Sequence, residues 1–275
     1  MAGNGGNRVD ATALGGVSAT MMWTLRNRAV EASHPDGMLE DPLSVQLYEA
    51  IDYPYENFGL ADQSHALRAR AFDIEVRLFL AAHPGATVVA LGEGLQTSYW
   101  RIGDDEVRWL SVDLPEVVDL RERLLPSEPN VTTLAISALD RTWMDYVNPD
   151  RGVFITAEGL LMYLPTEESL GLITDCARRF PGGRMMFDSI PKWLSNRTIK
   201  GLRVSRNYTA PQMPFHLSTT EAMALPKRIP EIAFAREVSL PLGRGLWGSR
   251  ILRTLFDMRP LRNARPTLTL CGFAG

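Results

Sequence analysis

Cysteine is scarce in this sequence: Cys176 and Cys271 are the only two in a chain of 275 residues. Two isolated cysteines exclude a disulfide framework and a cysteine-based zinc site, so we expect both to be buried free thiols. The histidines and acidic residues likewise show no cluster with the spacing of metal ligands. This argues against a bound metal and a metal-assisted mechanism.

The chain also lacks an excess of basic charge and any long apolar run. Its 29 Lys and Arg residues stand against 32 Asp and Glu residues, and a net charge of −3 gives no positive field that would attract nucleic acid or an anionic membrane. No stretch approaches the roughly 18 apolar residues of a membrane span, and the amino terminus has no apolar signal core. We therefore expect a cytoplasmic monomer or homodimer whose partner is a small molecule.

The composition itself is that of an ordinary globular protein, with 45% hydrophobic and 22% charged residues. Helical patterns come first, at 17–32, from Asp41-Pro42 onward, and at 61–82. Asp is a good helix cap and Pro fits the first helical turn. The apolar stripe of the third helix consists of Leu67, Ala71, Ile74, Leu78 and Ala81.

From residue 84 onward, short apolar runs alternate with helical patterns. We predict strands at 86–91, 108–112, 131–136, 152–156, 184–187, 232–240 and 267–273. We predict helices at 115–125, 166–180 and 246–258. This alternation predicts an α/β fold with an open, doubly wound parallel sheet and helices on both of its faces.

We interpret 1–275 as a single domain with four parts. Residues 1–83 form an N-terminal helical cap, and 84–189 form the sheet core that carries the binding site. Residues 190–230 are an insertion rich in proline, apolar and aromatic residues, which we expect to cover the site as a lid. Residues 231–275 supply the C-terminal strands and a helix.

Polar and glycine residues directly after the strands are the first site candidates, because ligands of open parallel sheets bind beyond the carboxyl ends of the strands. After the first strand, Gly92-Glu93-Gly94 permits a tight turn and a close approach of a ligand to the backbone. Thr97 stands where a pyrophosphate-binding turn has its third glycine. The turn alone therefore fits a cofactor site or a plain turn.

Asp113 follows the second strand, 19 residues beyond Gly94. An acid at about this separation accepts hydrogen bonds from the ribose hydroxyls of a nucleoside cofactor. Asp113 is also placed to cap the helix that Pro115 opens, and both roles can hold together.

After the third strand, residues 137–140 either flank an adenine ring or cap the next helix. Glu158 follows the fourth strand, where ionising a buried carboxylate without a partner is costly. It is either a ligand-binding acid or a structural acid bonded to backbone amides.

Arg70 lies at the edge of the apolar stripe of the third helix and can reach inward to bind a carboxylate with two N–H groups. Its alternative is a surface ion pair with Asp73.

Taken together, these positions resemble the S-adenosylmethionine-dependent methyltransferases of the leucine carboxyl methyltransferase family, in the branch of the tetracenomycin polyketide O-methyltransferase. The segments that carry the resemblance are DPLS at 41–44, RARAFD at 68–73, VVALGEGLQTSYWRI at 88–102, VDLPEVVDLRERLLP at 112–126, AEGLLMYLP at 157–165 and PLGRG at 241–245. Their combination is far more specific than any single segment. One departure is Gln96-Thr97-Ser98, where the family commonly has Asp-Thr-Arg.

The resemblance implies a class I methyltransferase fold, a Rossmann-like seven-stranded sheet whose last strand is antiparallel. It also implies S-adenosyl-L-methionine as cofactor. By this resemblance the cofactor's methionine carboxylate contacts Arg70, and its methionine part lies on Gly92, Glu93 and Gly94. Its ribose is bound at Asp113 and Leu114, and its adenine lies beside Ser137, Ala138 and Leu139. Its amino or sulfonium group lies near Glu158 and Gly159.

Methyl transfer from a sulfonium is an in-line displacement that needs alignment and exclusion of water but no nucleophilic side chain. A carboxylic acid is already ionised at pH 7, whereas a phenol lacks about three pKa units, or roughly 4 kcal/mol, and needs a base. His216 in the insertion and Tyr163 after the fourth strand are the candidate bases. Because neither is compelling, carboxyl methylation is favoured over phenol methylation.

The insertion also suggests the nature of the acceptor. Its apolar and aromatic residues predict a small apolar or aromatic, polyketide-like acceptor, as in secondary metabolism. They are Trp193, Tyr208, Met213 and Phe215. Two other functions compete with an O-methyltransferase: a nicotinamide-dependent oxidoreductase, which Thr97 disfavours, and a non-catalytic cofactor-binding regulator.

Overall fold

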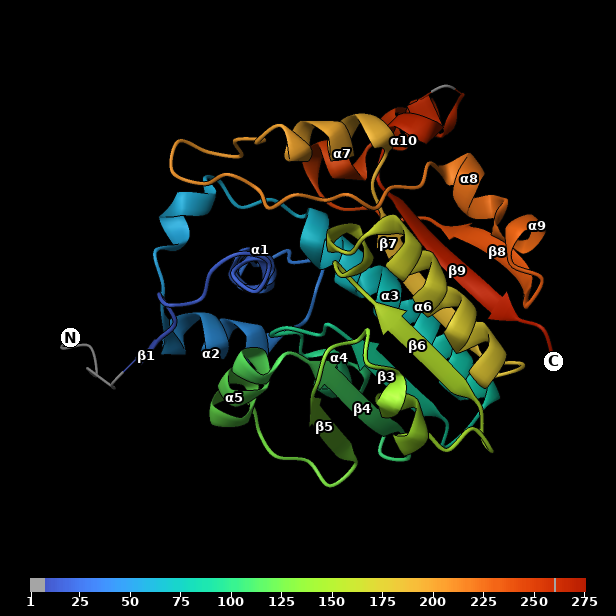
Figure 1. Ribbon diagram of the computed structural model, residues 1–275. Coiled ribbons are helices and arrows are strands. Elements are labelled where there is room, and N and C mark those ends of the chain that lie inside the picture. The colour runs from blue at the N-terminus through green and yellow to red at the C-terminus, as the bar shows by residue number, and fades with distance from the viewer. Residues whose placement is uncertain (1–7, 260) are drawn as a thin grey trace.

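The computed structural model describes residues 8–259 and 261–275, and its centre is a seven-stranded sheet in the order β5-β4-β3-β6-β7-β9-β8 (Figure 1). The strands are β3 Thr87–Leu91, β4 Arg108–Asp113, β5 Val131–Ala135, β6 Val153–Ala157, β7 Arg184–Ser189, β8 Ile232–Val238 and β9 Thr267–Phe273. Strands β3 to β7 are parallel, and β9 is antiparallel to both neighbours. The predicted mostly parallel α/β sheet with an antiparallel last strand is confirmed.

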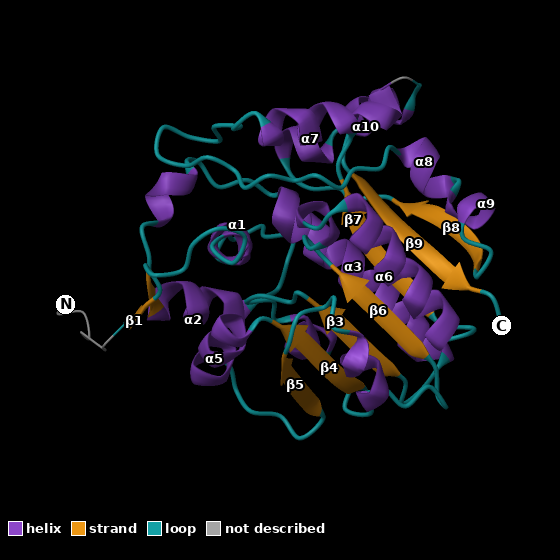
Figure 2. Ribbon diagram, in the orientation of Figure 1, coloured by secondary structure: helices purple, strands orange, loops and turns teal. Residues whose placement is uncertain are grey.

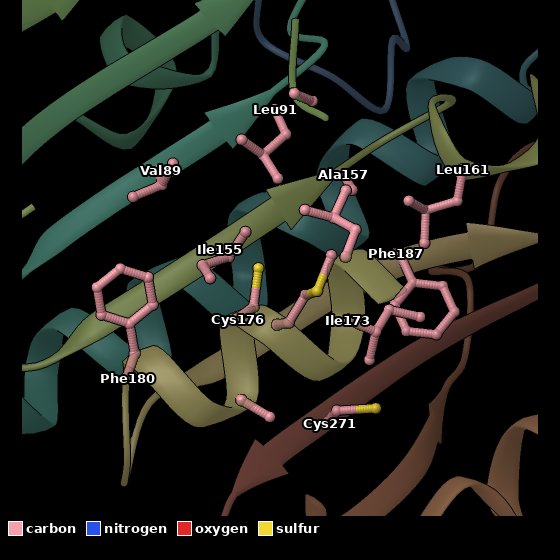
Figure 3. Packing of buried hydrophobic residues seen from close by; sticks show 14 of the residues in the cluster. Val89, Leu91, Ile155, Ala157, Leu161, Ile173, Cys176, Phe180, Phe187 and Cys271 are labelled. Carbon is pink, nitrogen blue, oxygen red and sulfur yellow. The ribbon is translucent and has the colours of Figure 1, made fainter. Parts of the chain in front are cut away.

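Alternating strand residues build one apolar layer on each face of the sheet. Val89 and Ile155 pack with α6 (Thr166–Arg179) in the layer of Figure 3. Their neighbours Val88 and Phe154 point to the opposite layer, where α3 (Ser64–Ala82) and α4 (Ser98–Ile102) cover the sheet. Both cysteines are buried free thiols, as predicted, and burial raises the pKa of Cys271 to about 12.

Helices α1 (Thr20–Ala32) and α2 (Pro42–Ala50) precede α3 and lie to one side of the sheet (Figure 1). The predicted start of α2 is confirmed, because Asp41 Oδ1 accepts a hydrogen bond from the Ser44 amide at 3.0 Å and Pro42 occupies the first turn. A short parallel pair, β1 (Val9–Asp10) and β2 (Ile51–Asp52), flanks these helices.

The predicted apolar stripe of α3 is buried at Leu67 and Ala71 but wrong in its second half. Ile74 and Leu78 are 40% and 58% exposed, whereas Phe72, Val76 and Phe79 are buried. The helix begins at Ser64 and packs on two sides, so its small residues Ala66, Ala69 and Ala71 are buried as well. Contacts with α1 on one side and the sheet on the other make the buried surface wider than a single stripe.

The remaining helices are α5 Pro115–Leu124, α7 Lys192–Ile199, α8 Thr219–Met223, α9 Leu225–Arg228 and α10 Arg250–Asp257. The 3₁₀ turns are η1 Tyr55–Phe58, η2 Arg141–Tyr146, η3 Leu161–Tyr163, η4 Gly245–Gly248 and η5 Leu261–Ala264. Between α7 and α8 the chain runs as a long loop, and Figure 2 shows it beside the N-terminal helices. Within the described ranges, no helix combines the length and apolar character needed to span a membrane.

The predicted helix at 246–258 is wrong in its extent, because it is divided at Ser249. The first part is the short turn η4, and Ser249 then caps α10 by accepting a hydrogen bond from the Leu252 amide. A serine cap starts a new helix because its hydroxyl satisfies an amide that has no partner in the first turn.

Candidate active site

A cavity of about 670 Å³ lies at the carboxyl ends of the parallel strands, between the sheet and helices α1 and α3. Its size is within the roughly 300–1,000 Å³ of small-molecule sites. The strand order reverses between β3 and β6, and ligands of doubly wound sheets bind at this point. The wall contains every proposed cofactor residue except Arg70, namely Gly92, Glu93, Gly94, Asp113, Leu114, Ser137, Ala138, Leu139, Glu158 and Gly159.

The glycine turn after β3 presents bare backbone to the cavity. Gly92 and Gly94 have φ values of 60° and 56°, a region that other L-residues rarely adopt. A Cβ on Gly92 would lie 2.8 Å from Leu160 Cδ1, and one on Gly94 would lie 3.0 Å from Met21 Cβ. The turn is therefore packed from both sides and accepts only glycine at these two positions.

Asp113 joins the end of β4 to the glycine turn. Its Oδ2 accepts a hydrogen bond from the Gly94 amide at 2.7 Å, and its Oδ1 accepts one from the Leu114 amide at 2.8 Å. The N-cap residue of α5 is Leu114, and no side chain accepts a capping hydrogen bond there. Asp113 is therefore not the helix cap. Burial raises the pKa of Asp113. Each carboxylate oxygen keeps a lone pair for a ligand on the cavity side.

The arginine of α3 that lines the cavity is Arg68 and not Arg70. Arg68 Nε donates to Glu158 Oε1 at 2.9 Å, and its Nη1 donates to Asp188 Oδ2 at 2.9 Å. Residues two apart on an α-helix differ by about 200°, so only one of the two arginines can face the cavity. The proposed pair of Arg70 with Asp73 is also wrong, because Asp73 binds Arg101 at 2.7 Å.

Glu158 is buried in the cavity wall, and its partners are side chains rather than backbone amides. Its Oε1 accepts hydrogen bonds from Arg68 and from Gln96 Nε2, the latter at 2.8 Å. Burial raises its pKa, and the Arg68 charge opposes this effect. Gln96 stands at the departure from the family pattern and here binds the cavity carboxylate.

Asp188 is a cavity residue that the sequence reasoning missed. It lies near the end of β7, and its Oδ1 accepts a hydrogen bond from the Gly159 amide at 2.6 Å. Its Oδ2 binds Arg68. The signal that could have found it is its position: it is the acidic residue at the carboxyl end of a buried parallel strand, as Asp113 and Glu158 are.

Two wall residues from other loops have local structural partners. The Glu93 carboxylate binds Arg121 at 2.9 Å and accepts a hydrogen bond from Trp109 Nε1 at 3.4 Å. Ser137 Oγ accepts a hydrogen bond from the Leu139 amide at 3.2 Å. These contacts fix the two loops against the sheet beneath the cavity.

Of the two candidate bases, Tyr163 lines the cavity and His216 does not. Burial raises the pKa of Tyr163, which makes its hydroxyl a poor base at neutral pH. His216 is partly buried outside the cavity wall, and its Nδ1 has no partner among the described residues. The cavity histidine is instead His65 of α3, which no sequence motif singled out.

Of the four apolar and aromatic residues proposed to face the acceptor from the insertion, only Met213 lines the cavity. Trp193 is half exposed and donates from Nε1 to the Ala264 carbonyl at 2.8 Å. Phe215 belongs to the core layer beside α6, and Tyr208 packs edge-on against Phe58. The rest of the apolar wall on this side consists of Ile190, Leu194, Val238, Leu240, Trp247, Pro266 and Leu268.

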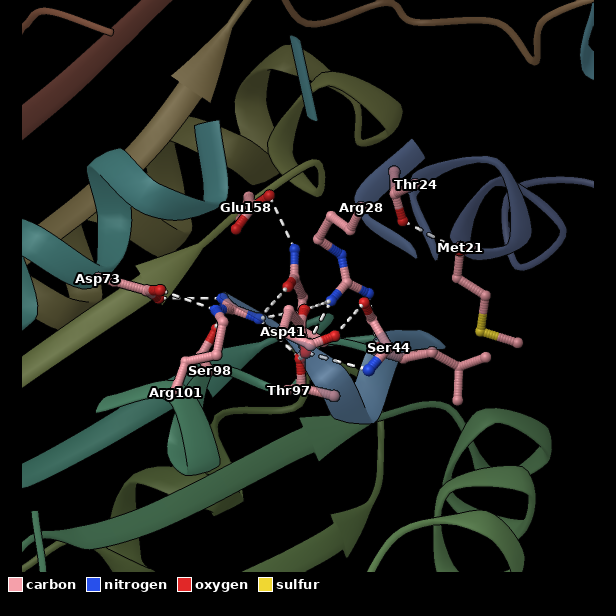
Figure 4. Close-up of polar contacts among 12 residues, drawn as sticks. Met21, Thr24, Arg28, Asp41, Ser44, Asp73, Thr97, Ser98, Arg101 and Glu158 are labelled. Carbon is pink, nitrogen blue, oxygen red and sulfur yellow. Dashed lines mark hydrogen bonds and ion pairs between the residues drawn. The ribbon is translucent and has the colours of Figure 1, made fainter. Parts of the chain in front are cut away.

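A buried ionic network ties the N-terminal helices to the turn (Figure 4). Asp41 binds Arg28 at 3.0 Å and Arg101 at 3.1 Å, and it accepts a hydrogen bond from the Thr97 hydroxyl. Arg101 also binds Asp73. Thr97, at the place of the missing third glycine, therefore holds α2 against the segment that follows the turn.

The family model of the leucine carboxyl methyltransferases matches residues 21–177 of the chain. The chain belongs to the leucine carboxyl methyltransferase family. It is an S-adenosylmethionine-dependent methyltransferase, and the match runs from α1 into α6 and includes β3, β4, β5 and β6 but not β7.

Relatives of this methyltransferase include the tetracenomycin polyketide synthesis O-methyltransferase TcmP of Streptomyces glaucescens, 30% identical over 82% of this chain and 84% of TcmP. The S-adenosyl-L-methionine-dependent methyltransferase dpfgK of Gibberella zeae is 30% identical over 64% of this chain and 67% of its own. Among solved structures, the plantazolicin methyltransferase BamL, crystallised with a desmethyl plantazolicin analogue and S-adenosylhomocysteine, has a TM-score of 0.51 at 12% identity, covering 94% of this chain and 100% of BamL. The last likeness establishes the fold alone.

Proposed function

We propose that this methyltransferase transfers a methyl group from S-adenosylmethionine to an oxygen of a small apolar or aromatic, polyketide-like acceptor. The observation that carries the proposal is the division of one cavity into a polar and an apolar side. Carboxylates and the glycine turn line it at the strand ends, and apolar side chains from residues 190–268 line another part of its wall. TcmP is an O-methyltransferase, which supports oxygen as the methylated atom.

The polar side fits the cofactor by its chemistry. Gly92 and Gly94 present backbone without side chains to the cavity, and Asp113 can accept further hydrogen bonds from ribose hydroxyls. Arg68 takes the place that the sequence reasoning gave to Arg70 and is the cation for the methionine carboxylate. Glu158 supplies negative charge for the amino or sulfonium group.

The cofactor, when bound, supplies a methyl group on a positively charged sulfur that an acceptor oxygen can displace in line. The chain's own contribution is then alignment and the exclusion of water. The ionic network of Asp41 and Arg101 holds the helical cap over the turn, and the apolar wall around Leu194, Met213 and Trp247 removes water from the acceptor side.

Two measurements test the proposal. Titration calorimetry with S-adenosylhomocysteine is expected to show binding, with NADH as a control ligand that gives no heat. Incubation with S-adenosylmethionine and either 1-naphthoic acid or 1-naphthol is expected to give the methyl ester or the methyl ether, identified by mass spectrometry. Absence of S-adenosylhomocysteine binding at millimolar concentration, or a methyl group on carbon or nitrogen, would contradict the proposal.

A further inference from the structure

His65 is a cavity residue that the proposed cofactor contacts leave unused. It lies one helical turn before Arg68, so both side chains point from α3 to the same side. The ring packs edge-on against Trp23 of α1 with 5.3 Å between ring centroids. Trp23 also lines the cavity. His65 is therefore held between α1 and α3 with one side toward the ligand space.

A hydrogen bond from Asn27 fixes which nitrogen of the ring carries the proton. Asn27 is fully buried in α1, and its Nδ2 lies 2.8 Å from His65 Nδ1. An amide nitrogen can only donate, so Nδ1 accepts and a neutral ring has its proton on Nε2. In this orientation the Asn27 oxygen is buried without a partner among the described residues. Buried N–H groups without partners are rarer than carbonyl oxygens without them.

The other nitrogen, Nε2, is available to a ligand. It makes no hydrogen bond within the described part of the chain, and it is not among the enclosed polar atoms that lack a partner. His65 is a wall residue, so the cavity is the open space beside the ring. The ring thus has one N–H donor that is free to bind a ligand in the cavity.

The charges around the ring keep it neutral. Burial lowers the pKa of His65 well below its ordinary value, and the positive charges of Arg68 and Arg28 lower it further. Arg68 comes from the same helix and Arg28 from α1. The carboxylates of Glu158 and Asp188 face Arg68 and neutralise part of its charge. A neutral donor in cationic surroundings suits an anionic oxygen.

We propose that His65, oriented by Asn27, binds the acceptor oxygen through Nε2–H and does not act as a base toward it. This inference rests on the proposed O-methyltransferase function. In the transfer step the new O–CH₃ bond forms as the CH₃–S bond breaks and its electron pair stays on sulfur, so no proton passes through His65. Asn27 is a positioning residue, because it acts by keeping Nδ1 occupied and Nε2 protonated. An acceptor must therefore arrive already ionised.

Nuclear magnetic resonance tests the proton position without any acceptor. In long-range ¹H–¹⁵N spectra of ¹⁵N-histidine enzyme with S-adenosylhomocysteine, we expect His65 to be the neutral Nε2–H tautomer and not to titrate between pH 8 and 6. The chain has four histidines, so His65→Gln identifies its signals by their loss, and His34→Gln, at an exposed site, serves as the control. An Nδ1–H tautomer, or a protonated ring in this range, would overturn the proposal.

Binding of 1-naphthoate to the enzyme–S-adenosylhomocysteine complex tests the donor role. His65→Leu removes the donor and is expected to weaken naphthoate binding about 10- to 100-fold, while His65→Gln keeps an N–H donor and recovers part of that loss. If His65 acted as a base, both variants would lose that role equally. The inference is overturned if the two variants weaken naphthoate binding equally, if neither weakens it, or if the unaltered complex does not bind naphthoate.

Two further readouts separate this inference from its alternatives. S-adenosylhomocysteine affinity is expected to be unchanged in both His65 variants; absence of this affinity in the unaltered enzyme would instead contradict the proposed function. Asn27→Asp places a carboxylate beside Nδ1 and reverses the arrangement, so we expect naphthoate binding to become pH-dependent between pH 6 and 8. A flat profile in this variant would count against the positioning role of Asn27.

Discussion

Two arginines of α3, two residues apart, provide a matched pair for testing the cofactor site. Arg68 lines the cavity, whereas Arg70 faces away from it. Arg68→Ala removes a charge-assisted partner of the cofactor carboxylate and is expected to weaken S-adenosylhomocysteine binding by about 1.5–3 kcal/mol. Arg70→Ala is expected to change it little. Calorimetry on both variants measures this, and equal effects would remove Arg68 from its assigned role.

Asp113 is expected to affect binding both directly and through the turn. Asp113→Ala removes a proposed ribose acceptor and also frees the Gly94 amide that Oδ2 holds, so we expect a loss of about 1–3 kcal/mol in S-adenosylhomocysteine affinity. Asp119→Ala on α5 is the control, because its carboxylate is exposed and pairs only with Arg123 among the described residues. Unchanged affinity in Asp113→Ala would place the ribose elsewhere.

His65 predicts a specific dependence of folding stability on pH. Its pKa is lowered in the folded chain, so the unfolded chain binds more protons below the ordinary pKa of about 6.5. Stability is therefore lost as the pH falls below about 6.5, by up to about 1.4 kcal/mol per pH unit from this residue. In urea unfolding between pH 7 and 5, the free energy of unfolding should fall less steeply with decreasing pH in His65→Gln than in His34→Gln. An equal pH dependence of the free energy of unfolding in the two variants would contradict this contribution from His65.

For single site residues, the sequence predicts those that follow strands more reliably than those on helices. The positions of Gly94, Asp113 and Glu158 follow from where apolar runs end, and the structure puts all three in one wall. The sequence predicts Arg70 because it takes the phase of α3 from a stripe that includes Ile74 and Leu78, and both of these residues are exposed. A helix buried on two sides has no single apolar stripe from which a phase can be derived.

Between elements, the buried ionic network is the most sensitive connection. Arg101 of α4 binds both Asp73 of α3 and Asp41 before α2. Arg101→Met leaves two buried carboxylates with fewer partners, and we expect a loss of about 3–5 kcal/mol in the free energy of unfolding. Arg123→Met breaks an exposed pair and is expected to cost about 0–1 kcal/mol. Urea unfolding compares the two, and similar losses would show the network to be unimportant.

Strand positions were predictable to within two residues, because each strand is a short apolar run bounded by polar or turn residues. The N-terminal start of α2 was equally clear from Asp41-Pro42. The division of the last helix at Ser249 was not, because the residues on both sides of it have helical spacing. Whether the helix breaks at Ser249 depends on the fold of the chain around Gly248 as well as on the serine cap.

In the whole molecule, ligand binding is expected to stabilise the fold, because the cavity wall includes α1, α3 and all five parallel strands or the loops after them. At 100 times its dissociation constant, S-adenosylhomocysteine should add about 2.7 kcal/mol to the free energy of unfolding. Thermal unfolding with and without the ligand measures this gain. Arg68→Ala, tested at the same ligand concentration, should gain less, and no gain in the unaltered protein would contradict a preformed site.

The two sides of the cavity come from different stretches of the chain. The ion pairs around the glycine turn join Arg28, Asp41, Asp73, Arg101 and the Glu93–Arg121 pair, all before residue 122. The apolar wall comes from residues 190–268. If the proposed acceptor wall is correct, we expect substitutions in the second stretch to exchange one acceptor for another while the methyl donor stays in place, so that evolution, or an engineer, can adjust the substrate range independently of the chemistry.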